Sequence, residues 1–243
     1  MQLIDFFDRA YVINLPDRKD RRRMIVQELK KIGMPLTPNK TDIFPAIRPD
    51  DAGAFPSVGA RGCFLSHLAI LKQAKQDCLD RVLIMEDDLT ISGRFKTNQE
   101  ILVEQLRQKD WGFVYFGHVE PGAADPVTLR PFSGVIITTH FYGINGAIFD
   151  RLLSFLEEVQ RRPAEHHNGG PMHLDGAYST FREQNPDVVT LIASPNLGWQ
   201  RSSRSDISDN KWFDQVPGFK QVVGAVREGK VLLKASFDFR QID

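Results

Sequence analysis

The sequence has little that would mark a secreted, membrane-embedded or nucleic-acid-binding protein. Only two of its 243 residues are cysteines, so no disulfide framework is available and a reducing cytoplasm is the expected location. Its 31 basic and 31 acidic residues cancel, so no overall field attracts nucleic acid or an anionic membrane. No apolar run approaches about 18 residues, the length that spans a bilayer, and the N-terminus shows no secretion signal. Any membrane contact would therefore be peripheral.

Internal repeats, low-complexity linkers and phosphate-binding fingerprints of the Walker or dinucleotide type are also missing. Short apolar runs instead alternate with segments of helical periodicity. We expect strands at residues 11–15, 82–85, 111–117 and 188–193, helices at 20–32, 63–76, 100–109, 146–160 and 174–181, and an edge strand or hairpin at 134–139. This alternation predicts an α/β fold with a mostly parallel central sheet and helices on both of its faces. Residues 34–62 are expected to be loop with short extended pieces, and residues 200–206 a flexible polar loop.

The most informative segment is RVLIMEDD, residues 81–88, in which a buried strand ends in three consecutive acids. The carboxyl end of such a strand is where open α/β sheets place their ligands. Three adjacent carboxylates repel one another unless a cation neutralises them, and Mg²⁺ or Mn²⁺ prefers such oxygen ligands. The alternative is a solvated acidic turn after a core strand. Glu86, Asp87 and Asp88 are therefore candidates for a metal or nucleotide site.

A second candidate region is the end of the first strand, where Asn14 is followed by several arginines. The guanidinium fork matches phosphate oxygens, so a strand end followed by arginine suits a nucleotide. Arg22 and Arg23 are expected on the solvated face of the next helix, and Arg21 is the arginine favoured for function.

The segment GARGCFLSH, residues 59–67, is a third candidate. Its two glycines at a helix entrance could let backbone N–H groups approach a phosphate. Ser66 and His67 could face a ligand, or they could be a satisfied pair in the core. Cys63 lies among apolar residues and is expected to pack there.

The fourth candidate is the pair His173 and Asp175 at the start of a helix. Asp175 could be an ordinary first-turn acid that stabilises the helix. It could equally be a base that removes a proton from a hydroxyl nucleophile.

Taken in their order along the chain, these motifs resemble glycosyltransferase family 25, which includes lipooligosaccharide biosynthesis enzymes and collagen galactosyltransferases. The resemblance covers roughly residues 11–210. Its most specific parts are GCFLSH at residues 62–67 and the EDD strand end, and it is supported by YVINL at 11–15 with Arg21 and by FPAI at 44–47. The second half is more variable, with matches at Gly146, Asp175, Pro195 and residues 205–207.

The resemblance implies a GT-A-type, Rossmann-like fold and transfer of a hexose, typically galactose, from a UDP-sugar with Mn²⁺ or Mg²⁺. It implies a single domain over residues 1–243, with a nucleotide-binding half (1–110), an acceptor half (111–210) and a packed C-terminal tail (211–243). Glu86 and Asp88 would bind the metal. Asp175 would be the catalytic base, with His173 as the weaker alternative. The nucleotide contacts would be Asn14, Arg21, Gly62, Ser66, His67 and Asp87.

The acceptor implied by the resemblance is a hydroxyl of a glycan, glycolipid or peptide, and the biological setting lipopolysaccharide biosynthesis. Two other interpretations stay open. A metal-dependent phosphohydrolase or nucleotidyltransferase would also use a carboxylate cluster. The second of these interpretations is a catalytically inactive protein that only binds a sugar nucleotide.

Overall fold

The centre of the fold is a seven-stranded sheet in a computed structural model that describes residues 1–122 and 125–201. Across the sheet the strands are β2 (Thr41–Pro45), β1 (Arg9–Asn14), β3 (Arg81–Glu86), β7 (Phe141–Asn145), β5 (Phe113–Tyr115), β8 (Thr190–Ser194) and β6 (Thr128–Pro131). Five of the strands run in one direction, and β7 and β6 are antiparallel to their neighbours. The predicted α/β fold with a mostly parallel sheet is confirmed.

Apolar side chains on both faces explain why these strands lie inside the molecule. In β1, Ala10 and Val12 contribute to the hydrophobic core on one face, and Tyr11 and Ile13 to the core on the other. Successive side chains of a strand point to opposite faces, so a continuous apolar run supplies both cores at once. β3 follows the same alternation from Val82 to Met85.

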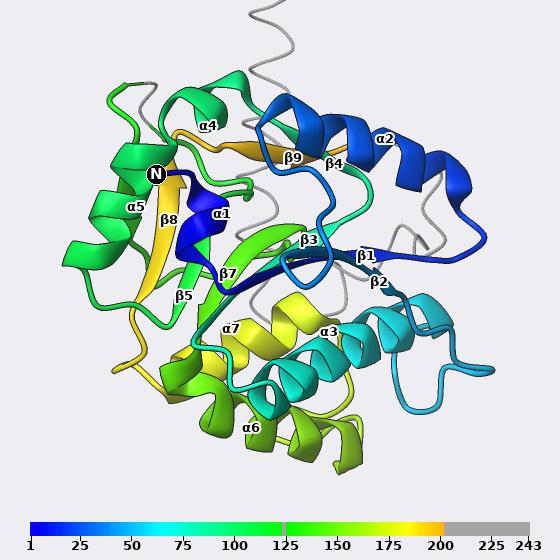
Figure 1. Cartoon of the computed structure of the whole chain (residues 1–243). Helices are drawn as coiled ribbons and strands as arrows, with labels where there is room; N and C mark the ends of the chain where they lie inside the picture. Colours follow the sequence, from blue (N-terminus) through cyan, green and yellow to red (C-terminus); the bar gives the residue numbers. More distant parts are fainter. Residues whose placement is uncertain (123–124, 202–243) are drawn as a thin grey trace, which may run out of the picture. The chain divides into compact units, whose positions relative to one another are not determined.

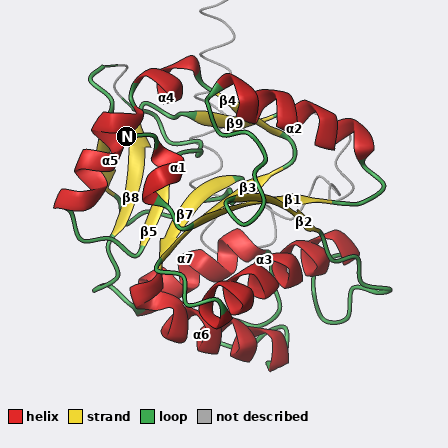
Figure 2. Cartoon of the chain, viewed as in Figure 1, coloured by secondary structure: helices red, strands yellow, loops and turns green. Residues whose placement is uncertain are grey.

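Helices cover both faces of the sheet, as predicted. One group consists of α1 (Leu3–Phe6), α2 (Lys19–Lys31), α4 (Gly93–Thr97) and α5 (Gln99–Gln108). The other consists of α3 (Val58–Gln76), α6 (Phe149–Arg161), which follows the 3₁₀ turn η1 (Gly146–Ile148), and α7 (Leu174–Gln184). Figures 1 and 2 show α3, α6 and α7 together on one side of the strands, away from α2, α4 and α5.

A second, two-stranded sheet lies beside the end of β3. It pairs β4 (Leu89–Ile91) with β9 (Gly198–Gln200) in antiparallel fashion, with Leu89 opposite Gln200. β4 follows the acidic turn directly, so this pairing brings a distant part of the chain to that turn.

Some predicted elements need correction. Helix α3 begins at Val58 instead of Cys63, because Ser57 caps it by accepting a hydrogen bond from the Ala60 N–H at 3.0 Å. Residues 134–139 form neither a strand nor a hairpin, and the antiparallel edge strand is β6. Of the loop expected at residues 200–206, Gln200 ends β9 and residues 202–206 lie outside the described residues.

Strand β7 lies in the middle of the sheet and was not predicted. Its sequence is interrupted by Gly143, which sequence patterns associate with turns. In the structure, a Cβ atom at Gly143 would lie 2.6 Å from the ring of Phe7. The glycine therefore allows an aromatic ring to pack directly on the strand backbone.

The described residues fall within one compact unit, which includes all of the predicted nucleotide-binding half and most of the predicted acceptor half. The tail predicted for residues 211–243 lies outside the described residues. Within residues 1–122 and 125–201, no helix is both long enough and apolar enough to cross a bilayer.

Candidate active site

The acidic segment forms a tight turn at the carboxyl end of the central strands. Glu86 is the last residue of β3, Asp87 and Asp88 form the turn, and β4 starts at Leu89. Glu86 is aligned with Ile13 of the parallel strand β1, so Asn14 at the end of β1 lies at the same edge. Parallel strands end together at one edge of a sheet, which is why two segments far apart in sequence meet here.

Asp87 is the buried centre of this arrangement, with a residue exposure of 6%. Asn14 Nδ2 donates to one of its carboxylate oxygens at 2.7 Å, and Arg21 Nη1 donates to the other at 3.1 Å. Burial raises the pKa of the Asp87 carboxyl, although the Asn14 hydrogen bond and the Arg21 charge oppose that rise. The structure therefore brings together three predicted residues, Asn14, Arg21 and Asp87. Arg22 and Arg23 are exposed, as expected.

Asp88 differs from Asp87 in how its two carboxylate oxygens are used. Its Oδ2 lies 3.6 Å from Arg21 Nη1, and its buried Oδ1 has no hydrogen-bond partner among the described residues. Burial, followed by repulsion from Glu86, raises the pKa of Asp88 to about 7. A buried oxygen without a partner in a cluster of carboxylates fits a hard divalent cation, which binds such oxygens and offsets their repulsion.

Glu86 has a different set of partners from the other two acids. The Thr139 hydroxyl donates to its Oε1 at 3.1 Å, and Gln200 Nε2 donates to its Oε2 at 3.0 Å. Thr139 is close because β7 is antiparallel to β3, so the residues just before β7 lie beside the end of β3. Burial opposes ionisation of Glu86, but His67, His140 and Thr139 hold its pKa below the ordinary value.

Arg201 is a site residue that the sequence did not reveal. Its backbone N–H donates to the Asp88 carbonyl at 2.8 Å, and its Nη2 donates to the Asp87 carbonyl at 2.8 Å. Gln200 and Arg201 are more than 110 positions from the turn, and the β4–β9 pairing brings them there. Their one sequence signal is that they begin the polar segment at residues 200–206.

The expectation that Gly62 and Ser66 contact a nucleotide finds no support in the geometry. Gly62 is the fifth residue of α3 and not its entrance, and a Cβ atom there would lie 2.6 Å from the Ile47 carbonyl oxygen. Ser66 is fully buried, where its hydroxyl donates to the Gly62 carbonyl and accepts from the Ile47 N–H. Both residues hold the segment after β2 against α3, and for Ser66 this is the core role left open above.

His67 is also fully buried, but it is directed at the acids. Its Nδ1 lies 2.6 Å from the Tyr142 hydroxyl, and its Nε2 lies 3.8 Å from Glu86 Oε1. The second distance is too long for a hydrogen bond. His67 therefore lines the same site as Glu86 from the side of α3.

Asp175 lies in the first turn of α7, with its Oδ1 accepting a hydrogen bond from the Gly176 N–H at 2.8 Å. Burial, together with the negative charge of Glu86, raises the pKa of Asp175 to about 7, although the hydrogen bond from Gly176 opposes that rise. His173 is the residue that precedes the helix, and partial burial lowers its pKa. Both interpretations of Asp175, helix acid and base, remain compatible with this geometry.

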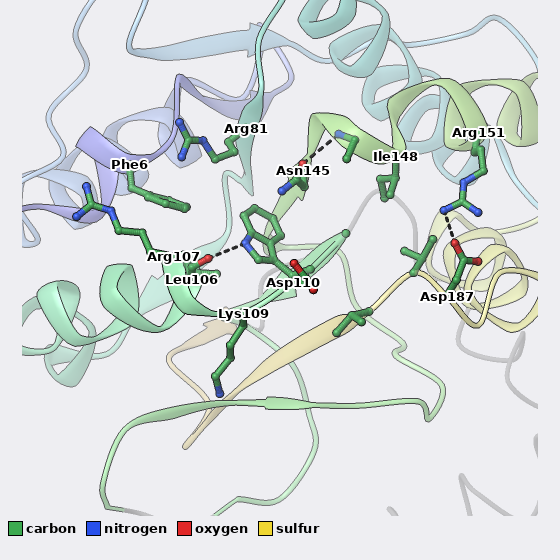
Figure 3. A pocket seen from close by; sticks show the side chains of 15 residues that line it. Phe6, Arg81, Leu106, Arg107, Lys109, Asp110, Asn145, Ile148, Arg151 and Asp187 are labelled. Carbon is green, nitrogen blue, oxygen red and sulfur yellow. Dashed lines mark hydrogen bonds and ion pairs between the residues drawn. The ribbon is translucent and has the colours of Figure 1, made fainter.

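A separate cavity of about 500 Å³ lies at the opposite edge of the sheet, where the parallel strands begin (Figure 3). Arg81 at the start of β3 stacks over the Phe6 ring at 4.5 Å, and Arg151 pairs with Asp187 at 2.8 Å. The Trp111 indole N–H donates to the Leu106 carbonyl at 3.1 Å. None of the predicted site residues lines this cavity.

Comparison with known proteins agrees with the motifs at the acidic edge, which is the carboxyl end of β1 and β3 with the turn Glu86–Asp88. Residues 7–121 match the family model described as glycosyltransferase family 25 (LPS biosynthesis protein). Over these residues the chain is similar to glycosyltransferase family 25. The matched region contains both strand ends, Arg21, helix α3 and the acidic turn, so the resemblance read from these motifs is confirmed, whereas the motifs expected after residue 121 lie outside the match.

Curated relatives include proteins with the same family name and procollagen galactosyltransferases. A probable inactive glycosyltransferase 25 family member 3 of Rattus norvegicus is 27% identical over 154 residues, which is 56% of this chain and 27% of the relative. Procollagen galactosyltransferase 2 of Mus musculus is 28% identical over 143 residues, 51% of this chain and 23% of the relative. The chain thus spans about a quarter of the length of these relatives.

A solved structure supports the fold independently. The glycosyltransferase involved in glycosylation of the major capsid of PBCV-1 aligns with a TM-score of 0.51 and 11% identity. The alignment covers 81% of this chain and 93% of the viral protein. At this identity the likeness shows the fold alone, which is the GT-A-like α/β architecture that we expected.

Proposed function

We propose that this chain is a metal-dependent glycosyltransferase that moves a hexose, such as galactose, from a UDP-sugar to a hydroxyl of a glycan, glycolipid or peptide. The observation that carries the proposal is the buried Asp88 oxygen without a hydrogen-bond partner, at the strand edge where α/β sheets bind nucleotides. The match of residues 7–121 to the model of glycosyltransferase family 25 supports the same conclusion.

Asp88 would hold the Mn²⁺ or Mg²⁺ ion, with Glu86 close to its water ligands. When bound, such an ion neutralises the charge that develops on the departing UDP. Asp87 would act differently, because both of its oxygens are already used by Asn14 and Arg21. In our proposal it fixes Arg21 at the acidic edge, where the guanidinium group can reach a phosphate oxygen.

Asp175 would accept the proton of the acceptor hydroxyl. A carboxylate is a useful base at neutral pH when its pKa lies near 7, and burial gives Asp175 that property. His173 is the alternative base. Its pKa is lowered by burial, so its imidazole is neutral and able to accept a proton at neutral pH.

The proposal also includes a cytoplasmic location with peripheral access to a membrane-bound acceptor. Both cysteines are free thiols, which agrees with a reducing compartment. The word inactive in the names of several relatives favours one alternative, a protein that binds a sugar nucleotide without transferring the sugar.

The test is donor hydrolysis and transfer across a panel of sugar nucleotides, with Mn²⁺ or with a chelator. Turnover of a UDP-sugar that the chelator abolishes is the expected result. Binding of UDP-sugar without turnover on any acceptor would support the inactive alternative. Release of phosphate from simple phosphate esters would support a phosphohydrolase.

The role of Asp175 has its own prediction. Asp175→Asn should lower kcat by about 10²–10⁴-fold while donor affinity changes little, because proton removal contributes only in the transition state. Asparagine keeps the size of the side chain and its ability to accept from Gly176, so a helix role alone would leave kcat unchanged. Transfer kinetics at saturating donor, with a melting curve of the variant, separate the two roles.

A further inference from the structure

Three potential metal ligands meet on the side of the acidic edge that faces α3. Cys63 and His67 are four residues apart on one face of that helix, and Glu86 ends the neighbouring strand. Cys63 Sγ, one ring nitrogen of His67 and one carboxylate oxygen of Glu86 all lie within 4.8 Å of one another. Ligands of one zinc ion lie about 2.0–2.3 Å from it, so only small side-chain movements separate this arrangement from a coordination site.

His67 provides an independent indication of a missing ligand. Its side chain is fully buried, yet Nε2 has no hydrogen-bond partner among the described residues. An unsatisfied buried nitrogen is costly, and a bound metal would satisfy it. The other ring nitrogen is held by the Tyr142 hydroxyl at 2.6 Å, and Tyr142 in turn lies 3.1 Å from the Tyr178 hydroxyl. Such a partner on the second nitrogen fixes the ring orientation that a metal ligand needs.

Glu86 is oriented in the same way. Thr139 and Gln200 each donate a hydrogen bond to its carboxylate, which limits how far the group can rotate. Metal-binding carboxylates are typically supported by such outer hydrogen bonds. All three potential ligands therefore come from regular secondary structure, and two of them have outer partners.

We propose that Cys63, His67 and Glu86 form a binding site for a zinc-class transition metal, separate from the hard-cation role assigned to Asp88. A thiolate and an imidazole favour Zn²⁺ or Co²⁺ over Mg²⁺ and Mn²⁺. Three protein ligands leave one position of a tetrahedral ion for water or a substrate oxygen. Glu86 borders both sites, but Cys63 and His67 have no part in the proposed diphosphate site and favour a different metal, so this proposal does not rest on the proposed function.

The site also has a protonation requirement. Burial raises the pKa of the Cys63 thiol, and the negative charges of Glu86 and Asp175 raise it further, so the metal-free thiol is protonated at neutral pH. Thiolate is the form that binds metal, so binding should release a proton and weaken as pH falls.

The test uses Co²⁺ as a probe of the reduced 243-residue chain. One equivalent of Co²⁺ should produce the near-ultraviolet charge-transfer absorption of a cobalt thiolate, and Zn²⁺ should displace it whereas Mg²⁺ in large excess should not. Cys63→Ser should abolish the band. Cys78→Ser is the matched control, because the other cysteine is exposed and outside the cluster, and it should keep the band.

Two further variants separate this site from its surroundings. Tyr142→Phe removes an outer partner of His67 and should weaken Co²⁺ binding by about 10–100-fold. Asp88→Asn should keep the band, even if it loses nucleotide binding, so failure of one site does not imply failure of the other. No band in the wild-type protein, or an equal band in Cys63→Ser, would overturn the proposal. The wild-type measurement decides the matter even if a variant fails to fold.

Discussion

At the scale of single residues, Asp88 shows how burial and charge combine at the acidic turn. Its carboxyl pKa is about 7 in the folded protein, well above the value of about 3.9 for an aspartate in an unfolded chain. Between these two values the folded state binds more protons than the unfolded state. The stability of the metal-free protein should therefore fall as pH rises from about 4 to about 7, and Asp175 adds to the same trend.

Asp88→Asn should remove part of this pH dependence. Between about pH 5 and pH 8 in a chelator, we expect the wild-type protein to lose about 1–3 kcal/mol more stability than the variant. One pKa unit is worth about 1.4 kcal/mol, and the clustered carboxylates share protons, which reduces the full effect. Urea denaturation at the two pH values measures it. Asp50→Asn, at an exposed position, should follow the wild type, and parallel curves for Asp88→Asn would contradict the account.

Arg21 provides a second residue-scale prediction. It forms an ion pair with Asp87 in which the side chains are 14% and 9% exposed. Arg21→Ala would leave a buried carboxylate without its cation, so we expect a loss of about 3–5 kcal/mol in the free energy of unfolding and weaker UDP binding. Arg23→Ala, on the exposed face of the same helix, should change stability by less than about 0.5 kcal/mol. Equal effects from both changes would mean that Arg21 has no special role.

The sequence predicted this part of the site for a physical reason. Asn14, Arg21 and the acids follow apolar strands, and neighbouring parallel strands end at a common edge. Thr139, Gln200 and Arg201 could not be predicted in that way. Their contacts with the turn depend on an antiparallel insertion and on a strand pair that joins distant segments.

At the scale of elements, α3 is positioned by close backbone contact. A side chain at Gly62 would meet the Ile47 carbonyl oxygen, which belongs to the segment that follows β2. Gly62→Ala should therefore destabilise the protein by about 1–3 kcal/mol despite the higher helix propensity of alanine. Gly93→Ala lies at the exposed first position of α4, where an added Cβ would meet no atom within 4 Å, and should be neutral or stabilising by up to about 1 kcal/mol. Thermal unfolding compares the two, and a stabilised Gly62→Ala would show that the helix can move away.

Periodicity predicted the long elements and failed at the short ones. Helices α2 and α5 and strands β1 and β3 each show a clear apolar pattern, and the structure confirms them. β7 was missed because Gly143 interrupts it, and the reason for that glycine is the ring of Phe7, far away in sequence. The edge strand expected at residues 134–139 was wrong, since β6 pairs with β8 at Thr128–Pro131 instead.

At the scale of the whole molecule, the sheet separates two hydrophobic cores and presents the acids at one edge between them. The first core lies against α3, α6 and α7, and the second against α1, α2, α4 and α5. The antiparallel strand β7 places Thr139 and His140 beside the end of β3, and so links the second half of the chain to the acidic turn. The site is therefore a property of the assembled sheet, although its acids come from one short segment.

The central claim is that the acidic turn binds a nucleotide through a divalent cation held by Asp88. Isothermal titration of UDP into the protein, with Mn²⁺ and with a chelator, tests it most directly. We expect the wild-type protein to bind UDP only with Mn²⁺ present, and Asp88→Asn to lose that binding while its circular dichroism spectrum stays native. Wild-type affinity for UDP in the chelator, or undiminished Mn²⁺-dependent binding by Asp88→Asn, would contradict the account.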